Sequence, residues 1–293
     1  MEENKIMKGL CLAGGGVKAA AHIGALKAFE EENIKFDCVS GASSGSIVAT
    51  MYALGYTSDE MWNMFQRYCK KIKYAEWKQI LKLILGLILK REIIIDGLNT
   101  GKVIERIIEN ICKESKITNI NQIKMPLLIP MVDVQKGTVY IASSLQTRGN
   151  LLDNTKIITD IPISTAVRAS CSFPVVFSPC KFNEIQLVDG GIRENLPWKS
   201  LRNIGADKIY GIAFDTIHNE KQCCQNLIDV ATRSMELQGR ELSSYERQGI
   251  DNLILINLNK ISLLDNSKIN LLYEKGYKQT KKQLKELEKT GKI

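Results

Sequence analysis

The chain has 293 residues, of which 44% are hydrophobic, and its formal net charge is +8 at pH 7. A chain of this length can bury one large α/β core or two small ones. Residues 1–5 lack the basic and then apolar layout of a signal peptide, and no apolar run approaches the ~20 residues of a membrane span. We therefore expect neither a signal peptide nor a transmembrane helix.

The chain shows no internal repeat, no low-complexity tract and no linker rich in Pro, Gly or Ser. A single domain is the simplest organisation of such a chain. Its eight cysteines include no C-x-x-C pair, and most lie within apolar segments, where a free thiol behaves as a small core residue. This usage is typical of reduced thiols and predicts a cytoplasmic protein.

Short apolar runs alternate with segments of helical periodicity along the chain. We expect strands at residues 8–13, 36–40, 127–132, 139–142, 185–188, 208–214 and 253–256. We expect helices at residues 17–32, 43–54, 101–113, 222–248 and 266–288. This alternation predicts an α/β fold with a mostly parallel central sheet flanked by helices on both faces. Binding sites in such sheets lie outside the carboxyl ends of the strands, so motifs that follow different strands should meet there.

Three consecutive glycines, Gly14, Gly15 and Gly16, follow the first predicted strand and precede a helix. The backbone N–H groups of such a loop can point at an anion, and the helix adds positive potential. In ester hydrolysis that anion is the developing oxyanion, so we expect an oxyanion hole here. Lys18, in the same turn, is expected to be a solvated residue at the start of the helix.

A dinucleotide site is the alternative for this loop. Gly14-x-Gly16-x-x-Ala19 fits the pattern G-x-G-x-x-G/A, which requires an acidic residue at the end of the second strand. That strand ends in Ser40, and Asp37 lies at its start. The position of Asp37 therefore disfavours a dinucleotide.

The second predicted strand leads into Gly41-Ala42-Ser43-Ser44-Gly45, a G-x-S-x-G sequence followed by a helix. A serine on a tight turn between strand and helix holds its hydroxyl clear of the backbone, at the positive end of the helix. Gly41 and Gly45 let the turn form without Cβ clashes. Ser43 is therefore the candidate nucleophile, and an ordinary small-residue turn is the alternative.

Residues 67–91 carry a concentrated positive charge, with eight Lys or Arg and a single acidic residue. Apolar side chains recur there at helical spacing, from Trp77 to Ile88, and Lys78 and Lys82 fall on another face. This pattern suits an interfacial helix on an anionic lipid surface. A core helix with a solvated basic edge, or a lid over the site, fits it equally well. The basic tail at 278–292 lacks interleaved aromatic residues, so we expect a solvated helix and no nucleic-acid partner.

Asp189-Gly190-Gly191 directly follows the predicted strand at 185–188. A carboxylate at a strand end beside two glycines suits a base that must approach another backbone closely. A carboxylate with its ordinary pKa near 4 is a poor base for a serine, but burial can raise that pKa. Asp189 is therefore the candidate general base, and a hairpin corner is the alternative.

Only two histidines exist, so a Ser-His-Asp triad would have to use His22 or His218. His22 lies within the first predicted helix, where a packed structural imidazole is expected. His218 follows Ser43 and Asp189 in the order of α/β-hydrolases, but its neighbours form a polar loop without a glycine. These positions favour a Ser-Asp dyad over a triad.

Four blocks of the sequence together resemble the patatin-like phospholipases, a family of serine acyl hydrolases with a Ser-Asp dyad. The blocks are residues 12–18, 39–45, 167–174, and 188–191 leading to 195–197. The resemblance spans roughly residues 8–215. It implies a single patatin-like catalytic domain over residues 1–293, with a helical C-terminal region at 222–293.

The resemblance also implies residue roles. These are Ser43 as nucleophile, Asp189 as general base and Gly14–Gly16 as oxyanion donors. The family usually has glycine where this chain has Ala19, in the first helical turn, where a methyl group is tolerated. In the third block we expect Arg168 to form a structural ion pair.

The sequence thus predicts a lipid acyl hydrolase that acts on fatty-acyl esters, with phospholipid as the expected substrate. No Ca²⁺ loop or Zn²⁺ ligand cluster is evident, and we expect neither metal nor cofactor. A module that binds lipid without turnover remains the alternative from a different class.

Overall fold

The computed structural model describes residues 6–90, 92–145, 154–215, 224–258, 261 and 265–291. Within these ranges one sheet contains all nine strands and runs in the order β5-β4-β3-β2-β1-β8-β9, with β7 paired to β3 and β6 paired to β7. The strands are β1 (Lys8–Leu12), β2 (Cys38–Gly41), β3 (Leu127–Asp133), β4 (Val139–Ser143), β5 (Thr155–Ile158), β6 (Cys180–Phe182), β7 (Ile185–Asp189), β8 (Lys208–Asp215) and β9 (Asn252–Asn257).

Most neighbouring strands are parallel. The pairs β1–β2, β1–β8, β2–β3, β4–β5 and β8–β9 are parallel, whereas β3–β4, β3–β7 and β6–β7 are antiparallel. The predicted α/β class with a mostly parallel sheet is confirmed. The short strands β5 and β6 were not predicted, because neither has a run of apolar residues long enough to mark it.

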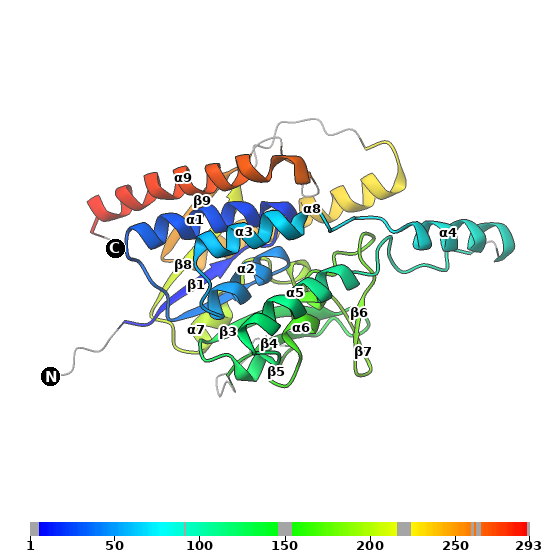
Figure 1. Ribbon diagram of the computed structural model, residues 1–293, viewed down its shortest axis with the longest axis horizontal. Coiled ribbons are helices and arrows are strands. Elements are labelled where there is room, and N and C mark those ends of the chain that lie inside the picture. The colour runs from blue at the N-terminus through cyan, green and yellow to red at the C-terminus, as the bar shows by residue number, and fades with distance from the viewer. Residues whose placement is uncertain are drawn as a thin grey trace.

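Helices flank both faces of the sheet (Figure 1). The described α-helices are α1 (Ala19–Glu31), α2 (Ser44–Ala53), α3 (Ser58–Cys69), α4 (Trp77–Leu85), α5 (Lys102–Ser115), α6 (Ile163–Ser170), α7 (Trp198–Asn203), α8 (Leu227–Glu246) and α9 (Ile269–Lys289). Side chains alternate across β1, so Leu10 and Leu12 join the larger core with α1 and Cys11 joins a smaller core with Leu201 of α7. This alternation produces the three-layer arrangement.

The C-terminal helix α9 packs along α1 through small residues. A Cβ at Gly24 of α1 would lie 2.1 Å from the carbonyl oxygen of Tyr273, and one at Gly276 would lie 2.1 Å from that of Ala21. The two backbones can approach this closely only because neither glycine has a side chain. The lysine-rich α9 therefore buries one face, including Leu284, and leaves its other face to solvent, as predicted for the basic tail.

The basic segment forms an arm that extends from the body of the protein (Figure 1). The arm consists of α4 and the π-helical turn η2 (Gly86–Lys90), which directly continues α4; residues 67–76 of the basic segment precede it. Trp77, Ile88 and Leu89 expose 74%, 69% and 75% of their surface. The expectation of a core helix is therefore wrong. Among the described residues, no helix is long and apolar enough to cross a membrane.

Candidate active site

Ser43 lies in the turn between β2 and α2 with φ 50° and ψ −129°. Positive φ is unfavourable for a residue with a Cβ, so the turn is strained and surrounding contacts must hold it. The Ser43 N–H donates to Ser170 Oγ of α6 at 3.0 Å, and its carbonyl accepts from the Ser46 N–H at 2.9 Å. The chain around Ser43 is thus fixed while its side chain stays partly exposed.

The two flanking glycines permit close backbone contacts. A Cβ at Gly45 would lie 2.5 Å from the Leu12 carbonyl oxygen of β1, and one at Gly41 would lie 2.4 Å from the Gly45 carbonyl oxygen. Any larger residue would force α2 away from β1 and would move Ser43. This is the physical reason for the G-x-S-x-G spacing in this chain.

The three loop glycines do not all have free amides. The Gly14 N–H donates to both the backbone oxygen and the side-chain Oδ1 of Asn195, at 3.2 and 3.1 Å. The amides of Gly15 and Gly16 donate to no described residue, and both glycines line the cavity next to Ser43. Gly15 and Gly16 are therefore the available donors of the loop, and Gly14 anchors it.

His22 of α1 hydrogen-bonds to Ala13, the residue that precedes the same glycine loop. Its ring is fully buried, its Nε2 is 2.7 Å from the Ala13 carbonyl oxygen, and it packs on Phe214 with ring centroids 4.5 Å apart. Burial lowers the pKa of His22 to about 4, so the ring is neutral and Nε2 carries the proton donated to Ala13. His22 thus has the packed environment expected of a structural histidine. His218, the other candidate for a triad, lies outside the described residues.

Asp189 ends β7 with only 2% of its surface exposed. Its Oδ1 accepts the Gly191 N–H at 2.8 Å, whereas its buried Oδ2 accepts no regular hydrogen bond from a described residue. A Cβ at Gly190 would lie 2.2 Å from the Pro130 carbonyl oxygen, so this glycine lets the turn pack against β3. Burial raises the pKa of Asp189 to about 7, against the opposing effects of the Ser43 hydroxyl and the Gly191 N–H.

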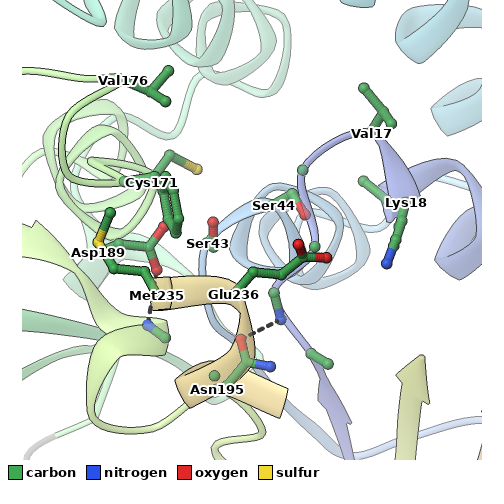
Figure 2. Close-up of a pocket in the computed structure, with 18 of the residues that line it drawn as sticks. Val17, Lys18, Ser43, Ser44, Cys171, Val176, Asp189, Asn195, Met235 and Glu236 are labelled. Atoms are coloured by element: carbon green, nitrogen blue, oxygen red, sulfur yellow. Dashed lines mark hydrogen bonds between the residues drawn. The ribbon is translucent and has the colours of Figure 1, made fainter. Parts of the chain in front are cut away.

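The Ser43 hydroxyl and the Asp189 carboxylate lie beside each other in the cavity (Figure 2). The contact is looser than a regular hydrogen bond, since Oδ2 has no partner of standard geometry. Catalytic hydrogen bonds are often longer in unliganded structures and shorten when substrate binds. The arrangement leaves one oxygen of a carboxylate with a raised pKa available to the Ser43 hydroxyl.

The route by which Asp189 reaches Ser43 differs from the sequence argument. The glycine loop and Ser43 do follow the carboxyl ends of the parallel strands β1 and β2. Strand β7, however, is antiparallel to β3, and it pairs only with the last three residues of that strand, with Asp189 opposite Met131. The three motifs meet because β7 ends there, and not because all three follow parallel strands.

A cavity of about 460 Å³ opens above Ser43. Apolar side chains from several helices and loops form much of its lining, among them Ile47, Phe65, Ile72, Phe173 and Phe177. No residue of α4 lines it, whereas Cys69, Ile72 and Tyr74, which precede α4 in the basic segment, do. The interpretation of the basic segment as a lid therefore stays a prediction. The inner face of α8 forms another wall of the cavity. Such a largely apolar cleft with a few polar groups is typical of a binding site for an apolar ligand.

The family model for patatin-like phospholipases matches residues 10–202, which include the glycine loop, Ser43 and Asp189. The chain belongs to the patatin-like phospholipase family. The resemblance inferred from the four sequence blocks is confirmed. Strands β8 and β9 and helices α8 and α9 lie outside the matched residues.

Two curated relatives illustrate the family's range. The uncharacterized protein YqhO of Bacillus subtilis is 29% identical over 63% of this chain and 63% of its own length. Lysophospholipase NTE1 of Debaryomyces hansenii is 26% identical over 70% of this chain but only 11% of its own length. The chain therefore matches less than two thirds of either relative.

One solved structure shares the fold over nearly the whole chain. VipD from Legionella pneumophila superposes with a TM-score of 0.53 and 17% identity, covering 96% of this chain and 67% of that one. At this identity the likeness concerns the fold alone. It extends beyond the residues that the family model matches.

Sequence reasoning was wrong about two basic residues of this region. Lys18 is 4% exposed and lines the cavity, and it is not a solvated residue at a helix start. Arg168 forms no ion pair with a described residue; its guanidinium donates to the carbonyl oxygens of Thr100 and Ser178. The surroundings of both side chains depend on the path of neighbouring loops, which cannot be inferred from local sequence periodicity.

Sequence reasoning also missed two positioning residues and one wall of the cavity. Ser170 holds the Ser43 N–H, and Asn195 joins the glycine loop to α8 through Nδ2, which donates to Ser243 Oγ at 2.7 Å. Both residues fall in or beside the quoted sequence blocks, which was the available signal. The described residues contain no cluster of His, Cys, Asp or Glu able to hold a metal ion.

Proposed function

We propose that this protein hydrolyses fatty-acyl esters of lipids, with Ser43 as nucleophile and Asp189 as general base. Membership of a phospholipase family supports a lipid hydrolase activity. The observation that carries the proposal is the pairing of a strained serine with a buried carboxylate at the base of an apolar cavity. An acyl chain would enter that cavity and place its ester carbonyl beside Ser43.

The first chemical step would acylate the enzyme. Asp189 Oδ2 takes the proton of the Ser43 hydroxyl as Oγ attacks the ester carbon. The N–H groups of Gly15 and Gly16 donate to the oxyanion that develops, an interaction typically worth about 3 kcal/mol per donor. Collapse of the tetrahedral intermediate expels the alcohol, which leaves with the proton held by Asp189.

The second step would release the fatty acid. Asp189 takes a proton from water, the resulting hydroxide attacks the acyl-Ser43 ester, and the same amides stabilise the second oxyanion. The proton returns to Ser43 Oγ as the acyl-enzyme bond breaks. A carboxylate with a pKa of about 7 suits both roles, because it is partly deprotonated at neutral pH and holds a proton well.

We also propose that the α4 arm contacts the lipid surface on which the substrate lies. Its large apolar side chains are exposed, and Lys78 and Lys82 lie beside them, also exposed. An apolar face flanked by lysines is typical of helices that lie in the interface of anionic membranes.

The decisive experiment replaces Ser43 by Ala and measures turnover of p-nitrophenyl butyrate and of phospholipid in mixed micelles. We expect Ser43→Ala to lower kcat by about 10⁴-fold or more, as loss of a nucleophile usually does. Ser44→Ala is the matched control, because Ser44 is the adjacent serine of the same motif. The control variant should keep most of the activity.

Labelling by a fluorophosphonate separates an enzyme from a lipid-binding module. The wild-type protein should be labelled and Ser43→Ala should not. Wild-type protein that neither reacts with the reagent nor turns over ester, but binds fatty acid, would support the binding module instead. His218→Ala should keep most of the activity, and its complete loss in that variant would favour the Ser-His-Asp triad over the dyad. Turnover that survives in Ser43→Ala would exclude Ser43 as the nucleophile.

A further inference from the structure

Helix α8 presents a row of charged side chains to the cavity. Arg233, Glu236 and Arg240 recur at spacings of three and four residues and therefore share one face of the helix. Glu236 Oε2 is 2.7 Å from Arg233 Nη1, and Glu236 Oε1 is 2.7 Å from Arg240 Nη2. Less than a quarter of each of these side chains is exposed. The row lies in the cavity wall and not on the solvated outer face of the helix.

Lys18 adds a third cation from the opposite side. It belongs to the glycine loop, is 4% exposed and forms no ion pair with a described residue. Its ammonium lies 5.9 Å from the ring centroid of Phe214. Burial lowers the pKa of Lys18 to about 8, and the charge of Glu236 is the main influence that opposes the shift. The Lys18 ammonium thus lies in the field of Glu236 without contacting it.

The Glu236 carboxylate projects into the cavity next to Ser44 and between Ser43 and Lys18 (Figure 2). It is the anion nearest to all three cations, and it carries one negative charge against their three positive charges. Arginine and lysine in a partly desolvated site bind an anion strongly, and the guanidinium fork matches the oxygens of carboxylate and phosphate alike. Among these four side chains the positive charges outnumber the negative one, and Glu236 is their internal counter-ion.

We propose that Lys18, Arg233 and Arg240 form a phosphate subsite beside Ser43, which the Glu236 carboxylate occupies when no ligand is bound. The occupant is the phosphate of a lipid head group whose acyl chain lies in the apolar part of the cavity. Entry of the phosphate displaces Glu236 from the two arginines. This proposal deepens the proposed function and rests on it for the identity of the bound lipid. The two arginines lie outside the residues matched by the family model.

The chemistry favours phosphate over a second carboxylate. A phosphate group presents several anionic oxygens, so two guanidinium groups and an ammonium can bind it together, whereas a carboxylate has only two oxygens. In a glycerophospholipid the phosphate is a few bonds from the ester. A phosphate bound between Lys18 and α8 would thus leave the ester within reach of Ser43.

The test measures binding and not turnover, so that it does not depend on the proposed reaction. Octyl phosphate, octyl glucoside and inorganic phosphate are titrated against the Ser43→Ala protein, and the charge variants are made in that background. Arg240→Gln should weaken octyl phosphate about tenfold, because one charged hydrogen-bonding partner is lost. Glu236→Gln should tighten it several-fold, because the competing carboxylate is removed. Neither change should affect octyl glucoside by more than about twofold.

Matched controls are Glu274→Gln and Lys278→Gln, which alter an exposed ion pair of α9 with a separation of 3.1 Å. They should leave all three affinities unchanged. The Glu236→Gln variant separates the proposal from a folding defect. A damaged fold would weaken the binding of octyl phosphate, whereas the proposal requires that binding to become tighter. Inorganic phosphate that binds as tightly as octyl phosphate would identify free phosphate, and not a lipid, as the ligand.

Equal affinity for octyl phosphate in Glu236→Gln, Arg240→Gln and the parent protein would overturn the subsite. Failure of the proposed function has a different signature. The wild-type protein would not hydrolyse p-nitrophenyl butyrate, while the opposite effects of the two charge variants on octyl phosphate would persist.

Discussion

The base of the cavity and the α4 arm differ in where they place small and large side chains. At the base, small residues allow backbones to approach each other, and Ser43, Asp189 and Asn195 are held by hydrogen bonds from several elements. In the arm, large apolar residues such as Trp77 and Ile88 are exposed. The comparison shows that apolar side chains in this protein do not by themselves mark the core. Substitutions at the base should cost catalysis and stability, whereas substitutions in the arm should cost lipid contact alone.

The largest expected effect concerns the carboxylate at the base. Asp189→Asn should lower kcat by about 10³- to 10⁴-fold, because the amide cannot accept the Ser43 proton. In the wild-type enzyme kcat/KM should rise with pH through about 7, where Asp189 loses its proton. A pH–rate profile of ester hydrolysis from pH 5 to 9 measures the loss of kcat in the variant and the pH dependence of kcat/KM in the wild-type protein. An unchanged profile in Asp189→Asn would exclude Asp189 as the base.

The second effect concerns packing beneath Ser43. Gly45→Ala places a methyl group 2.5 Å from the Leu12 carbonyl oxygen and 2.8 Å from that of Ala13. We expect a loss of roughly 3 kcal/mol or more in the free energy of unfolding, since two backbones must separate. Urea unfolding measures it. Gly239→Ala is the matched control, because a Cβ there meets nothing within 4 Å and the helix should gain slightly in stability. Equal stability of the two variants would contradict the packing argument.

Substitutions in the α4 arm should weaken lipid binding without lowering the stability of the protein. Lys78→Glu together with Lys82→Glu should weaken binding to anionic vesicles by at least tenfold, at about 1 kcal/mol for each lysine near the surface. Trp77→Ser with Ile88→Ser should weaken binding to neutral and anionic vesicles alike. Vesicle sedimentation measures binding, and thermal unfolding should show no loss of stability in either pair. Unchanged sedimentation would mean that the arm does not contact lipid.

The smallest expected effect concerns a buried carboxylate near the site. Burial raises the pKa of Glu194 to about 7, and burial together with the nearby charge of Glu194 raises the pKa of Glu246 to about 8. In the unfolded chain both groups titrate near pH 4.3. The folded state therefore holds protons that the unfolded chain has already released, and stability falls as pH rises through this window.

Glu194→Gln should reduce that fall, because its uncharged side chain does not titrate. The wild-type Tm should be a few degrees higher at pH 5.5 than at pH 8.5, and the variant should show a smaller difference. Glu274→Gln, on the exposed side of α9, should behave as the wild-type protein does. A wild-type Tm that rises from pH 5.5 to pH 8.5 would contradict the raised pKa values of Glu194 and Glu246.

Much of the base of the cavity could be predicted because its signals are local. The order of strand, three glycines and helix, and the spacing of Gly41, Ser43 and Gly45, follow from backbone constraints within a few residues. The α/β class followed from the alternation of apolar runs. Asp189 was identifiable as a carboxylate at the end of a strand. Its raised pKa was not, because burial depends on elements from several parts of the chain.

The residues that sequence reasoning missed or misjudged depend on distant contacts. Lys18 was expected in solvent, but it is buried and faces the charged row on α8, more than two hundred residues further along the chain. Asn195 holds the Gly14 N–H across 181 positions. Neither the periodicity of a helix nor the spacing of a motif predicts which distant segment will pack against that helix or motif.

The sequence by itself determined the fold class and the family, and it supplied the residues to which we assign the proposed acyl-transfer chemistry, since these are properties of short segments with strong backbone preferences. The tertiary structure decided which loop amides stay available, how an antiparallel strand brings Asp189 to Ser43, and which helix lines the cavity. It also decided that the apolar arm is exposed. These features depend on burial and on the pairing of distant segments, and the same local pattern is compatible with more than one such arrangement.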